Sequence, residues 1–220
     1  VLESIKANMS DIWMYADPES FELKDAIAKQ ENVKPENIAI GEGIDGLLGY
    51  LCRLLIDPGI SVVTSLGAYP TFNYHVSGFG GQLYFVPYKD DYEDVEQLMF
   101  KANQTKARLV YISNPDNPMG TFHSKEVIKE VINNLPENTV LCLDEAYSEF
   151  VPKNELPEIN PENPQIIRMR TFSKGYGMAG ARIGYAIGAE ELIKSFEKIR
   201  NHFGINLLAQ KAALIALDDQ

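Results

Sequence analysis

The stretch RTFSKGYGMAGARIGY, residues 170–185, has apolar runs on both sides and predicts a glycine-rich turn between two strands. Lys174 follows the first of these strands, beside Ser173, and Arg182 lies eight residues further on. A lysine at a strand end in a mostly apolar wall loses its proton readily and can form a Schiff base with an aldehyde. The glycines allow close backbone approach, and the arginine offers a planar fork for a phosphate. The alternative is a surface lysine in a loop with a structural arginine.

Working outward from this stretch, short apolar runs alternate with helical patterns along most of the chain. Most runs are continuously apolar, as in strands covered on both faces. We therefore expect an α/β fold, a mainly parallel seven-stranded sheet with helices on both faces. The predicted strands are 37–41, 61–65, 82–87, 108–114, 139–145, 166–172 and 182–188. The predicted helices are 18–30, 46–55, 95–101 and 125–133, followed by a helical tail, 189–220, with a break near FGIN.

The composition is that of an ordinary globular protein, with 45% hydrophobic and 23% charged residues and a net charge of −11. Its basic residues are scattered, which argues against nucleic-acid binding and against anionic membrane surfaces. Cys52 and Cys142 lie in apolar runs and are expected to be buried free thiols. The three histidines are far apart, so no metal site is expected. No run approaches the ~20 apolar residues of a membrane span, and no export signal is present, so we expect a cytoplasmic protein.

Polar residues gather where the predicted strands end, and in such sheets ligands bind outside the carboxyl ends of the strands. After the first strand, IAIGEGIDGLLGYL contains Gly41-x-Gly43-x-x-Gly46. A dinucleotide site would also need an acid about 20 residues on, at the end of a second strand. Asp57 lies instead in a DPG turn before that strand. One monophosphate at the start of a helix is therefore favoured over NAD.

Two further motifs follow the fourth and fifth strands, SNPDNPMG at residues 113–120 and DEAY at residues 144–147. Together with residues 170–185, and in this order, they resemble the class I/II aminotransferases. These are fold type I enzymes that use pyridoxal 5′-phosphate (PLP), and the histidinol-phosphate aminotransferase group is closest in style. NPDNPMG is similar to that family's NPxNPTG, with Met119 in place of the threonine. The resemblance covers essentially all 220 residues.

The resemblance implies roles for the residues around the cofactor ring. Lys174 would hold PLP as a Schiff base and then carry the proton between the substrate α-carbon and the cofactor. Asp144 would pair with the pyridine nitrogen, while Tyr147 and Asn117 would hydrogen-bond the phenolic oxygen. Other interpretations are a strand-end cap for Asp144, aromatic packing for Tyr147 and a turn residue for Asn117.

The resemblance also implies a phosphate site and two aromatic contacts. Phe72 would stack on the ring, with Tyr69 as the competing candidate and core packing as the alternative for both. Tyr15 matches a tyrosine that reaches the partner's phosphate across a dimer, although the segment around it is altered. The expected phosphate-binding residues are Gly43, Ile44, Asp45, Thr171, Ser173 and Arg182.

We therefore expect residues 1–220 to form the PLP-binding large domain of an aminotransferase, with the C-terminal small domain and an N-terminal arm lying outside the printed chain. The reaction would move an amino group between an amino acid or amine-phosphate and a 2-oxo acid, in a homodimer with shared active sites. The alternatives are a PLP-dependent decarboxylase, lyase or racemase on the same fold and a non-catalytic PLP-binding sensor domain.

Overall fold

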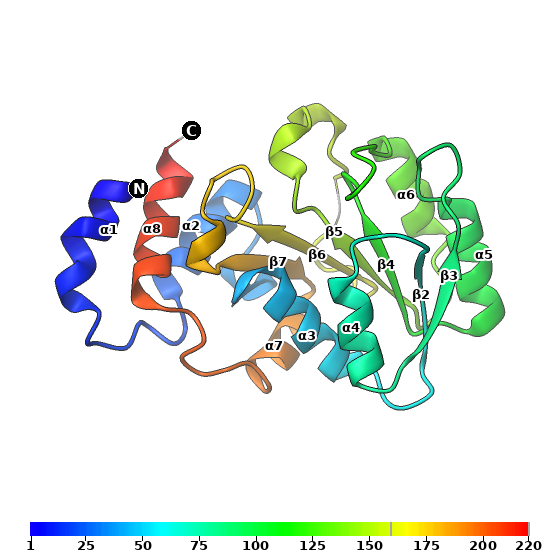
Figure 1. Cartoon of the computed structure of the whole chain (residues 1–220), viewed down its shortest axis with the longest axis horizontal. Coiled ribbons are helices and arrows are strands. Elements are labelled where there is room, and N and C mark those ends of the chain that lie inside the picture. The colour runs from blue at the N-terminus through cyan, green and yellow to red at the C-terminus, as the bar shows by residue number, and fades with distance from the viewer. Residues whose placement is uncertain (159, 220) are drawn as a thin grey trace.

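The computed structural model describes residues 1–158 and 160–219, which contain a seven-stranded sheet flanked by helices (Figure 1). The strand order across the sheet is β1-β7-β6-β5-β4-β2-β3. All neighbouring strands run parallel except β7, which is antiparallel to both β1 and β6. The strands are β1 Ile38–Gly41, β2 Ser61–Ser65, β3 Gln82–Val86, β4 Leu109–Ser113, β5 Val140–Asp144, β6 Ile166–Thr171 and β7 Gly184–Gly188.

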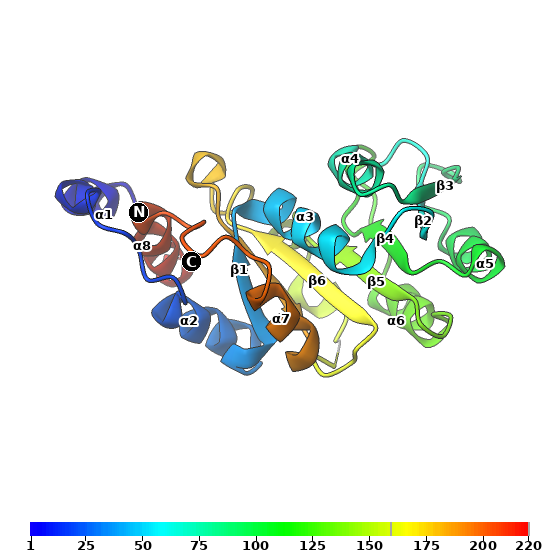
Figure 2. The ribbon, with the colours of Figure 1, turned by 90° about the horizontal axis from the view of Figure 1, so that it is seen from below.

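Helices cover both faces of the twisted sheet (Figure 2). One apolar cluster joins α3, α4 and α7 to one face, and two others join α2 and α8, and α5 and α6, to the opposite face. Helix α1 packs against α8, so the two ends of the chain lie side by side in Figure 1. The helices are α1 Leu2–Asn8, α2 Phe21–Glu31, α3 Gly43–Leu55, α4 Thr71–Gly78, α5 Val95–Thr105, α6 Lys125–Asn133, α7 Glu190–Glu197 and α8 Leu207–Asp218.

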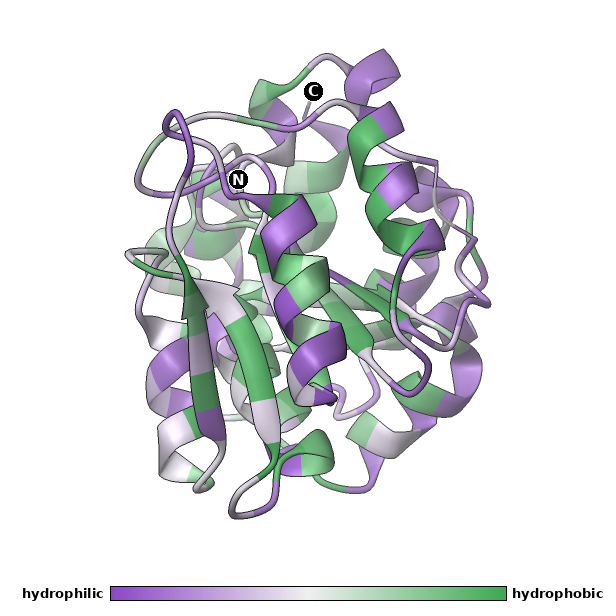
Figure 3. Ribbon diagram, turned by 90° about the vertical axis from the view of Figure 1, so that its right-hand side faces the viewer, coloured by the Kyte–Doolittle hydropathy of each residue, from purple (hydrophilic) through white to green (hydrophobic). Residues whose placement is uncertain are grey.

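The central strands are apolar throughout because successive side chains point to opposite faces and both faces are covered. On β4, for example, Leu109 and Tyr111 enter the α3 side of the core, whereas Val110 and Ile112 enter the α5 and α6 side. Figure 3 shows the same pattern, with hydrophobic strands inside and hydrophilic residues on the outer surfaces of the helices. This packing fixes the sheet and thereby the positions of the loops at its edges.

The predicted α/β fold is confirmed, and each of the seven predicted strands is present within one or two residues of its expected bounds. Three helix predictions needed correction, the starts of α2 and α3 and the end of α5, which lies at Thr105 instead of residue 101. Helix α2 begins at Phe21 rather than at residue 18, and the Asp17 carboxylate instead accepts hydrogen bonds from the backbone N–H groups of Glu19 and Phe21. Helix α3 begins at Gly43, three residues before its predicted start, and neither α1 nor α4 was predicted. Within the described residues, no helix is both long and apolar enough to cross a bilayer.

Candidate active site

A pocket of about 260 Å³ opens at the edge of the sheet where β4, β5 and β6 end. Its walls come from the start of α3, from the loop after β2 and from the connections that follow β4, β5 and β6. The pocket therefore lies outside the carboxyl ends of the parallel strands, where ligands bind in open α/β sheets. The lining residues are Ile44, Asp45, Leu48, Tyr69, Thr71, Tyr111, Ser113, Asn117, Asp144, Ala146, Tyr147, Thr171, Ser173, Lys174, Ala179 and Arg182.

Lys174 and Arg182 reach the pocket from the same connection, because β7 runs back beside β6. Lys174 follows the end of β6, and Arg182 precedes the start of β7, which lies at the same edge of the sheet. Lys174 is exposed, and its Nζ lies 5.3 Å from the centre of the Tyr147 ring, a distance typical of a cation–π contact. The antiparallel direction of β7 thus places an amine and a guanidinium at one site.

Asp144 ends β5 and is buried at the floor of the pocket. The Tyr111 hydroxyl donates to its Oδ2 at 2.6 Å, and the backbone N–H of Ala146 donates to its Oδ1 at 2.9 Å. Burial raises the pKa of Asp144 to about 6, against the opposing effect of these two hydrogen bonds. The carboxyl therefore titrates near neutral pH, in a cavity, which is common for functional groups.

Tyr147 and Asn117 reach the same pocket from two different loops. The Asn117 side-chain amide donates to the Tyr147 hydroxyl at 3.4 Å, so two polar groups that can bind one ligand oxygen lie together. Both residues are partly exposed and line the pocket. The structure thus brings together all four residues expected around the cofactor ring.

The start of α3 forms one wall of the pocket, and its donors suit an anion. Gly43 has φ +79°, and a Cβ at this position would lie 2.6 Å from the Nη2 atom of Arg182. The guanidinium donates to the carbonyl oxygens of Ala179 at 2.9 Å and of Glu42 at 3.3 Å. The first N–H groups of a helix have no partner within the helix, and the helix dipole favours negative charge there.

The hydroxyls of Thr171 and Ser173 face the same wall from the end of β6. Thr171 Oγ1 donates to Ser173 Oγ at 2.9 Å and accepts from the Ser173 backbone N–H at 3.1 Å. Asp45 lines the wall as well, and its carboxylate lies 2.8 Å from Nε2 of His75 on α4. The wall therefore combines helix N–H groups, two hydroxyls and one guanidinium, with the Asp45 charge held by a histidine.

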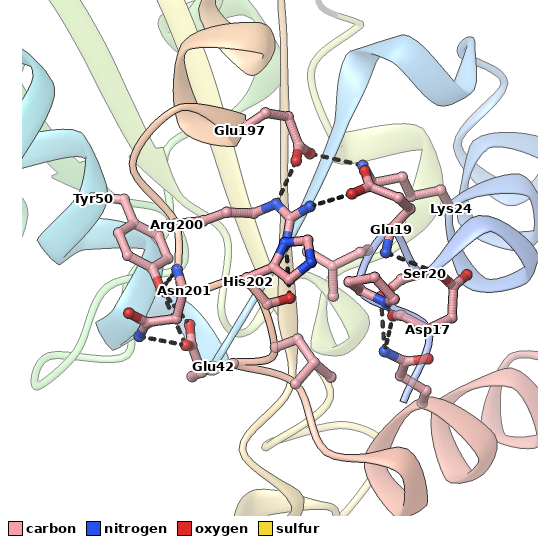
Figure 4. A pocket seen from close by; sticks show the side chains of 15 residues that line it. Asp17, Glu19, Ser20, Lys24, Glu42, Tyr50, Glu197, Arg200, Asn201 and His202 are labelled. Atoms are coloured by element: carbon pink, nitrogen blue, oxygen red, sulfur yellow. Dashed lines mark hydrogen bonds and ion pairs between the residues drawn. The ribbon is translucent and has the colours of Figure 1, made fainter. Parts of the chain in front are cut away.

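A separate polar cluster supports the turn before α3 from outside (Figure 4). The Glu42 carboxylate accepts hydrogen bonds from the Tyr50 hydroxyl at 3.0 Å and from the Asn201 side-chain amide at 3.1 Å. Nearby, Arg200 binds the carboxylates of Glu197 and Glu19. The space enclosed by this cluster is about 10 Å³, no more than one water needs. Its contacts fix the residue that precedes Gly43.

The structure corrects the choice of aromatic residue. Phe72 has no exposed surface and stacks on the Tyr111 ring, with 4.6 Å between ring centres, so it does not reach the pocket. Tyr69, the competing candidate, is half exposed and lines the pocket. Tyr15 lies outside this pocket, 78% exposed and stacked on Phe203, so a role at a partner's site stays a prediction. The remaining expected residues line the pocket except Gly43, whose backbone lies directly behind Arg182.

Sequence reasoning missed Tyr111, which supplies the shortest hydrogen bond to Asp144. In LVYIS it has the character of an ordinary core residue of a buried strand. The available signal was its hydroxyl, because a buried tyrosine oxygen needs a hydrogen-bond partner. Which partner it takes depends on the pairing of β4 with β5, and the sequence does not give that pairing.

The sequence and the fold together define the class of protein. A sequence model of the family described as aminotransferase class I and II matches residues 2–220, and the chain belongs to this family.

More specifically, the chain is similar to proteins named histidinol-phosphate aminotransferase. It is 38% identical to histidinol-phosphate aminotransferase 2 of Carboxydothermus hydrogenoformans, over 100% of this chain and 62% of that protein. It is also similar to the crystal structure of histidinol-phosphate aminotransferase from Sinorhizobium meliloti in complex with pyridoxal-5′-phosphate. That comparison gives 52% identity and a TM-score of 0.96, over 100% of this chain and 60% of that one. The chain thus spans about three fifths of the length of these relatives.

Proposed function

We propose that residues 1–220 form the large, cofactor-binding domain of a PLP-dependent aminotransferase of the histidinol-phosphate aminotransferase type. One observation carries the proposal: Lys174, the Asp144 carboxyl and the wall at the start of α3 with Arg182 surround a single pocket. The relatives named histidinol-phosphate aminotransferase, one of them bound to PLP, support the same assignment.

The pocket fits PLP in both size and chemistry. Its volume of about 260 Å³ suits a single small ring with a phosphate, but a dinucleotide would need more room. The wall at α3 offers donors for one phosphate group, and a Cβ at Gly43 would occupy the space of the Arg182 guanidinium. We assign the phosphate to the residues predicted for it, which are Gly43, Ile44, Asp45, Thr171, Ser173 and Arg182.

The opposite end of the pocket suits the ring. We assign Asp144 to the pyridine nitrogen, because a carboxylate there holds a proton on that nitrogen. Tyr147 and Asn117 would bind the phenolic oxygen, and Tyr69 would cover one face of the ring in place of Phe72. Lys174 would bind the aldehyde covalently.

When bound, PLP supplies an electron sink for negative charge that develops at the substrate α-carbon. The residues then have separate tasks. The Lys174 amine would carry the proton between the substrate α-carbon and the C4′ carbon of the cofactor. Asp144 would keep the ring nitrogen protonated, and the residues around Arg182 would hold the phosphate while the Lys174 amine carries the proton.

We propose that the substrates are an amino acid or amine-phosphate as donor and a 2-oxo acid as acceptor, used alternately. A decarboxylase or lyase would need the same lysine, aspartate and phosphate site. Transfer of the amino group to an added 2-oxo acid separates these reactions, because carbon dioxide or ammonia would otherwise be released without transfer. The names of the relatives favour the transferase.

The first prediction concerns Lys174. The protein mixed with PLP should turn yellow, and borohydride should attach the cofactor irreversibly to the peptide that contains Lys174. Lys174→Ala should lose this attachment, yet it should still bind PLP weakly because the wall at the start of α3 is intact. Mass spectrometry of the digested protein measures both outcomes. If borohydride still attached PLP to the Lys174→Ala protein, the assignment of Lys174 as the residue that binds the aldehyde would be wrong.

We also propose a cytoplasmic homodimer in which Tyr15 serves the partner's pocket. Its ring is exposed and lies outside the pocket of its own chain. The apolar N-terminal segment around it supports an interface, because large exposed apolar patches mark association sites. These exposed side chains are Leu2, Met9, Ile12, Trp13, Met14 and Tyr15.

A further inference from the structure

The buried pair of Tyr111 and Asp144 has a geometry that the proposed reaction can use. The two residues lie on neighbouring strands, β4 and β5, and both line the pocket. The hydroxyl of Tyr111 donates to Oδ2 of Asp144 at 2.6 Å, and both side chains are buried. A hydrogen bond to a buried charged group contributes more than one between neutral groups.

The Asp144 carboxylate keeps acceptor capacity for a ligand. Its two oxygens can accept about four hydrogen bonds, and the structure uses one on each, from Ala146 and from Tyr111. These two donors, one on each oxygen, fix the plane of the carboxyl group. The remaining lone pairs are therefore available to a donor in the pocket, such as a protonated ring nitrogen.

Phe72 holds Tyr111 in place. Its ring stacks on the Tyr111 ring with 4.6 Å between centres and 15° between planes, and neither ring has appreciable exposed surface. A close-packed core allows few alternative rotamers, so the hydroxyl stays aimed at Asp144. Phe72 thus supports the floor of the pocket instead of covering a ligand.

Several charged and titratable groups act on Asp144. Burial is the largest effect and raises its pKa, and the neighbouring Glu145 also raises it. The bonds from Tyr111 and Ala146 lower the pKa, as does the charge of Lys174. Two further titratable groups, Cys142 and Glu93, lie within electrostatic reach of the same carboxyl. The contribution of Tyr111 can be tested by itself, because substitution with phenylalanine removes the hydroxyl with little change in the shape of the side chain.

We propose that Tyr111 is a positioning residue, which orients the Asp144 carboxyl toward the pocket and favours its ionised form, so that it can hold a protonated ring nitrogen at neutral pH. This inference rests on the proposed function. It assigns Tyr111 a role that a purely structural core tyrosine would not have.

The test compares Tyr111→Phe with Tyr185→Phe. Tyr185 is an equally buried tyrosine on β7, and its hydroxyl also donates to a carboxylate, Glu31, at 2.7 Å, but it does not line the pocket. Each substitution removes one buried hydroxyl, so general losses of stability should be similar. The ionisation of Asp144 is measured without PLP, by NMR of ¹³C-labelled aspartate, with the signal assigned through Asp144→Asn.

The expected NMR midpoint for Asp144 is near pH 6 in the unchanged protein and in Tyr185→Phe. In Tyr111→Phe it should rise by about one pH unit, since a lost hydrogen bond to a charged group corresponds to at least that much. Incorporation of 3-fluorotyrosine at position 111, which keeps the ring but makes the hydroxyl a stronger donor, should lower the midpoint. This second variant decides the question even if Tyr111→Phe folds poorly.

PLP binding provides the second measurement. If only ionised Asp144 holds the ring, a midpoint change from about 6 to about 7 should raise the ratio of Kd at pH 6 to Kd at pH 8 about fivefold. The titration of the cofactor itself cancels in the comparison with Tyr185→Phe. An unchanged NMR midpoint in Tyr111→Phe, or an unchanged Kd ratio, would overturn the inference even though PLP still labels Lys174. Failure of the unchanged protein to bind PLP would overturn the proposed function itself.

Discussion

Gly43 and Arg182 occupy adjoining space at the start of α3, and each constrains the other. The backbone of Gly43 has φ +79°, and a Cβ there would approach Arg182 Nη2 to 2.6 Å. Arg182 itself has φ +55°, a conformation that costs energy for a side chain other than glycine. The arginine is thus held in a strained conformation beside the one residue type that leaves room for its guanidinium.

Gly43→Ala should therefore weaken PLP binding. The new methyl group would displace the guanidinium, and the positive φ would cost about 1 to 2 kcal/mol in addition. We expect Kd for PLP to rise at least tenfold, as measured by absorbance titration.

The matched control is Gly180→Ala, in the same connection as Arg182. A Cβ at Gly180 meets no atom within 4 Å, and its φ is not in the positive range. Its PLP affinity should remain within about twofold of the unchanged protein. Equal losses in the two variants would mean that the loop as a whole, and not the contact with Arg182, governs binding.

Three elements, β5, β6 and α2, are joined by a buried cluster of charges, the arginine–glutamate cluster. Its members are Glu145 after β5, Arg168 and Arg170 on β6, and Glu31 at the end of α2. Arg170 binds Glu145 at 2.8 Å and Glu31 at 2.8 Å, and Arg168 binds Glu145 at 2.9 Å. Since β5 ends at Asp144 and β6 leads to Lys174, this cluster fixes the relative position of the two elements that place these residues at the pocket.

Glu145→Gln should destabilise the fold by about 3 kcal/mol or more, because it takes the charge partner from Arg168 and leaves Arg170 with Glu31 alone. Urea unfolding measures the change. The control, Glu190→Gln, removes the partner of Lys194 in an exposed pair on α7, and solvent screening should leave the free energy of unfolding nearly unchanged. Similar effects in both variants would contradict a special role for the buried cluster.

Glu145→Gln also tests how the stability of the folded state depends on pH. Burial acts to raise the pKa of Glu145, but Arg168 and Arg170 outweigh it and hold the pKa below the ordinary value of 4.5. A lowered pKa stabilises the folded state above pH 4.5, and this contribution is lost as the pH falls through the folded pKa. Melting temperatures measured down through this range should fall less steeply for Glu145→Gln.

At this scale, much of the fold could be predicted from sequence. Continuous apolar runs located all seven strands, since both faces of each central strand are covered. The unpredicted helix α4 contains aromatic, β-branched and glycine residues of low helix propensity, and it forms because Phe72 and Val76, four positions apart, are both buried.

The sequence motifs identified nearly all the expected residues that line the pocket, but they indicated Phe72 instead of Tyr69 as the aromatic residue that faces it. Which aromatic ring faces the pocket depends on the register of α4 against Tyr111 on β4, a tertiary contact. Strand direction was the other gap, because no local pattern indicates that β7 runs antiparallel between β1 and β6.

For the whole molecule, we expect a homodimer that uses the exposed N-terminal segment. Trp13→Lys should raise the dimer dissociation constant at least tenfold, because exposed tryptophans in interfaces commonly contribute more than about 1.4 kcal/mol. Trp13 is 79% exposed on one chain, so the substitution should leave the fold of the chain intact. Analytical ultracentrifugation measures the association.

The control for this prediction is Phe100→Lys, a 61% exposed aromatic residue of α5, the helix at the opposite end of the molecule from α1 (Figure 1). It should leave association unchanged. If the unchanged protein sediments as a single chain at micromolar concentration, the shared active site with Tyr15 is wrong.

The connection between β6 and β7 begins and ends at residues that face each other, because Thr171 pairs with Gly184. The distance between the Lys174 amine and the Arg182 guanidinium is therefore governed mainly by the spacing of two adjacent strands, and the length of the intervening polypeptide has little influence on it. Extra residues inserted around Gly177 would bulge into solvent and leave both groups where they are. The rim of the pocket could thus change during evolution without changing the length of ligand that fits between Lys174 and Arg182.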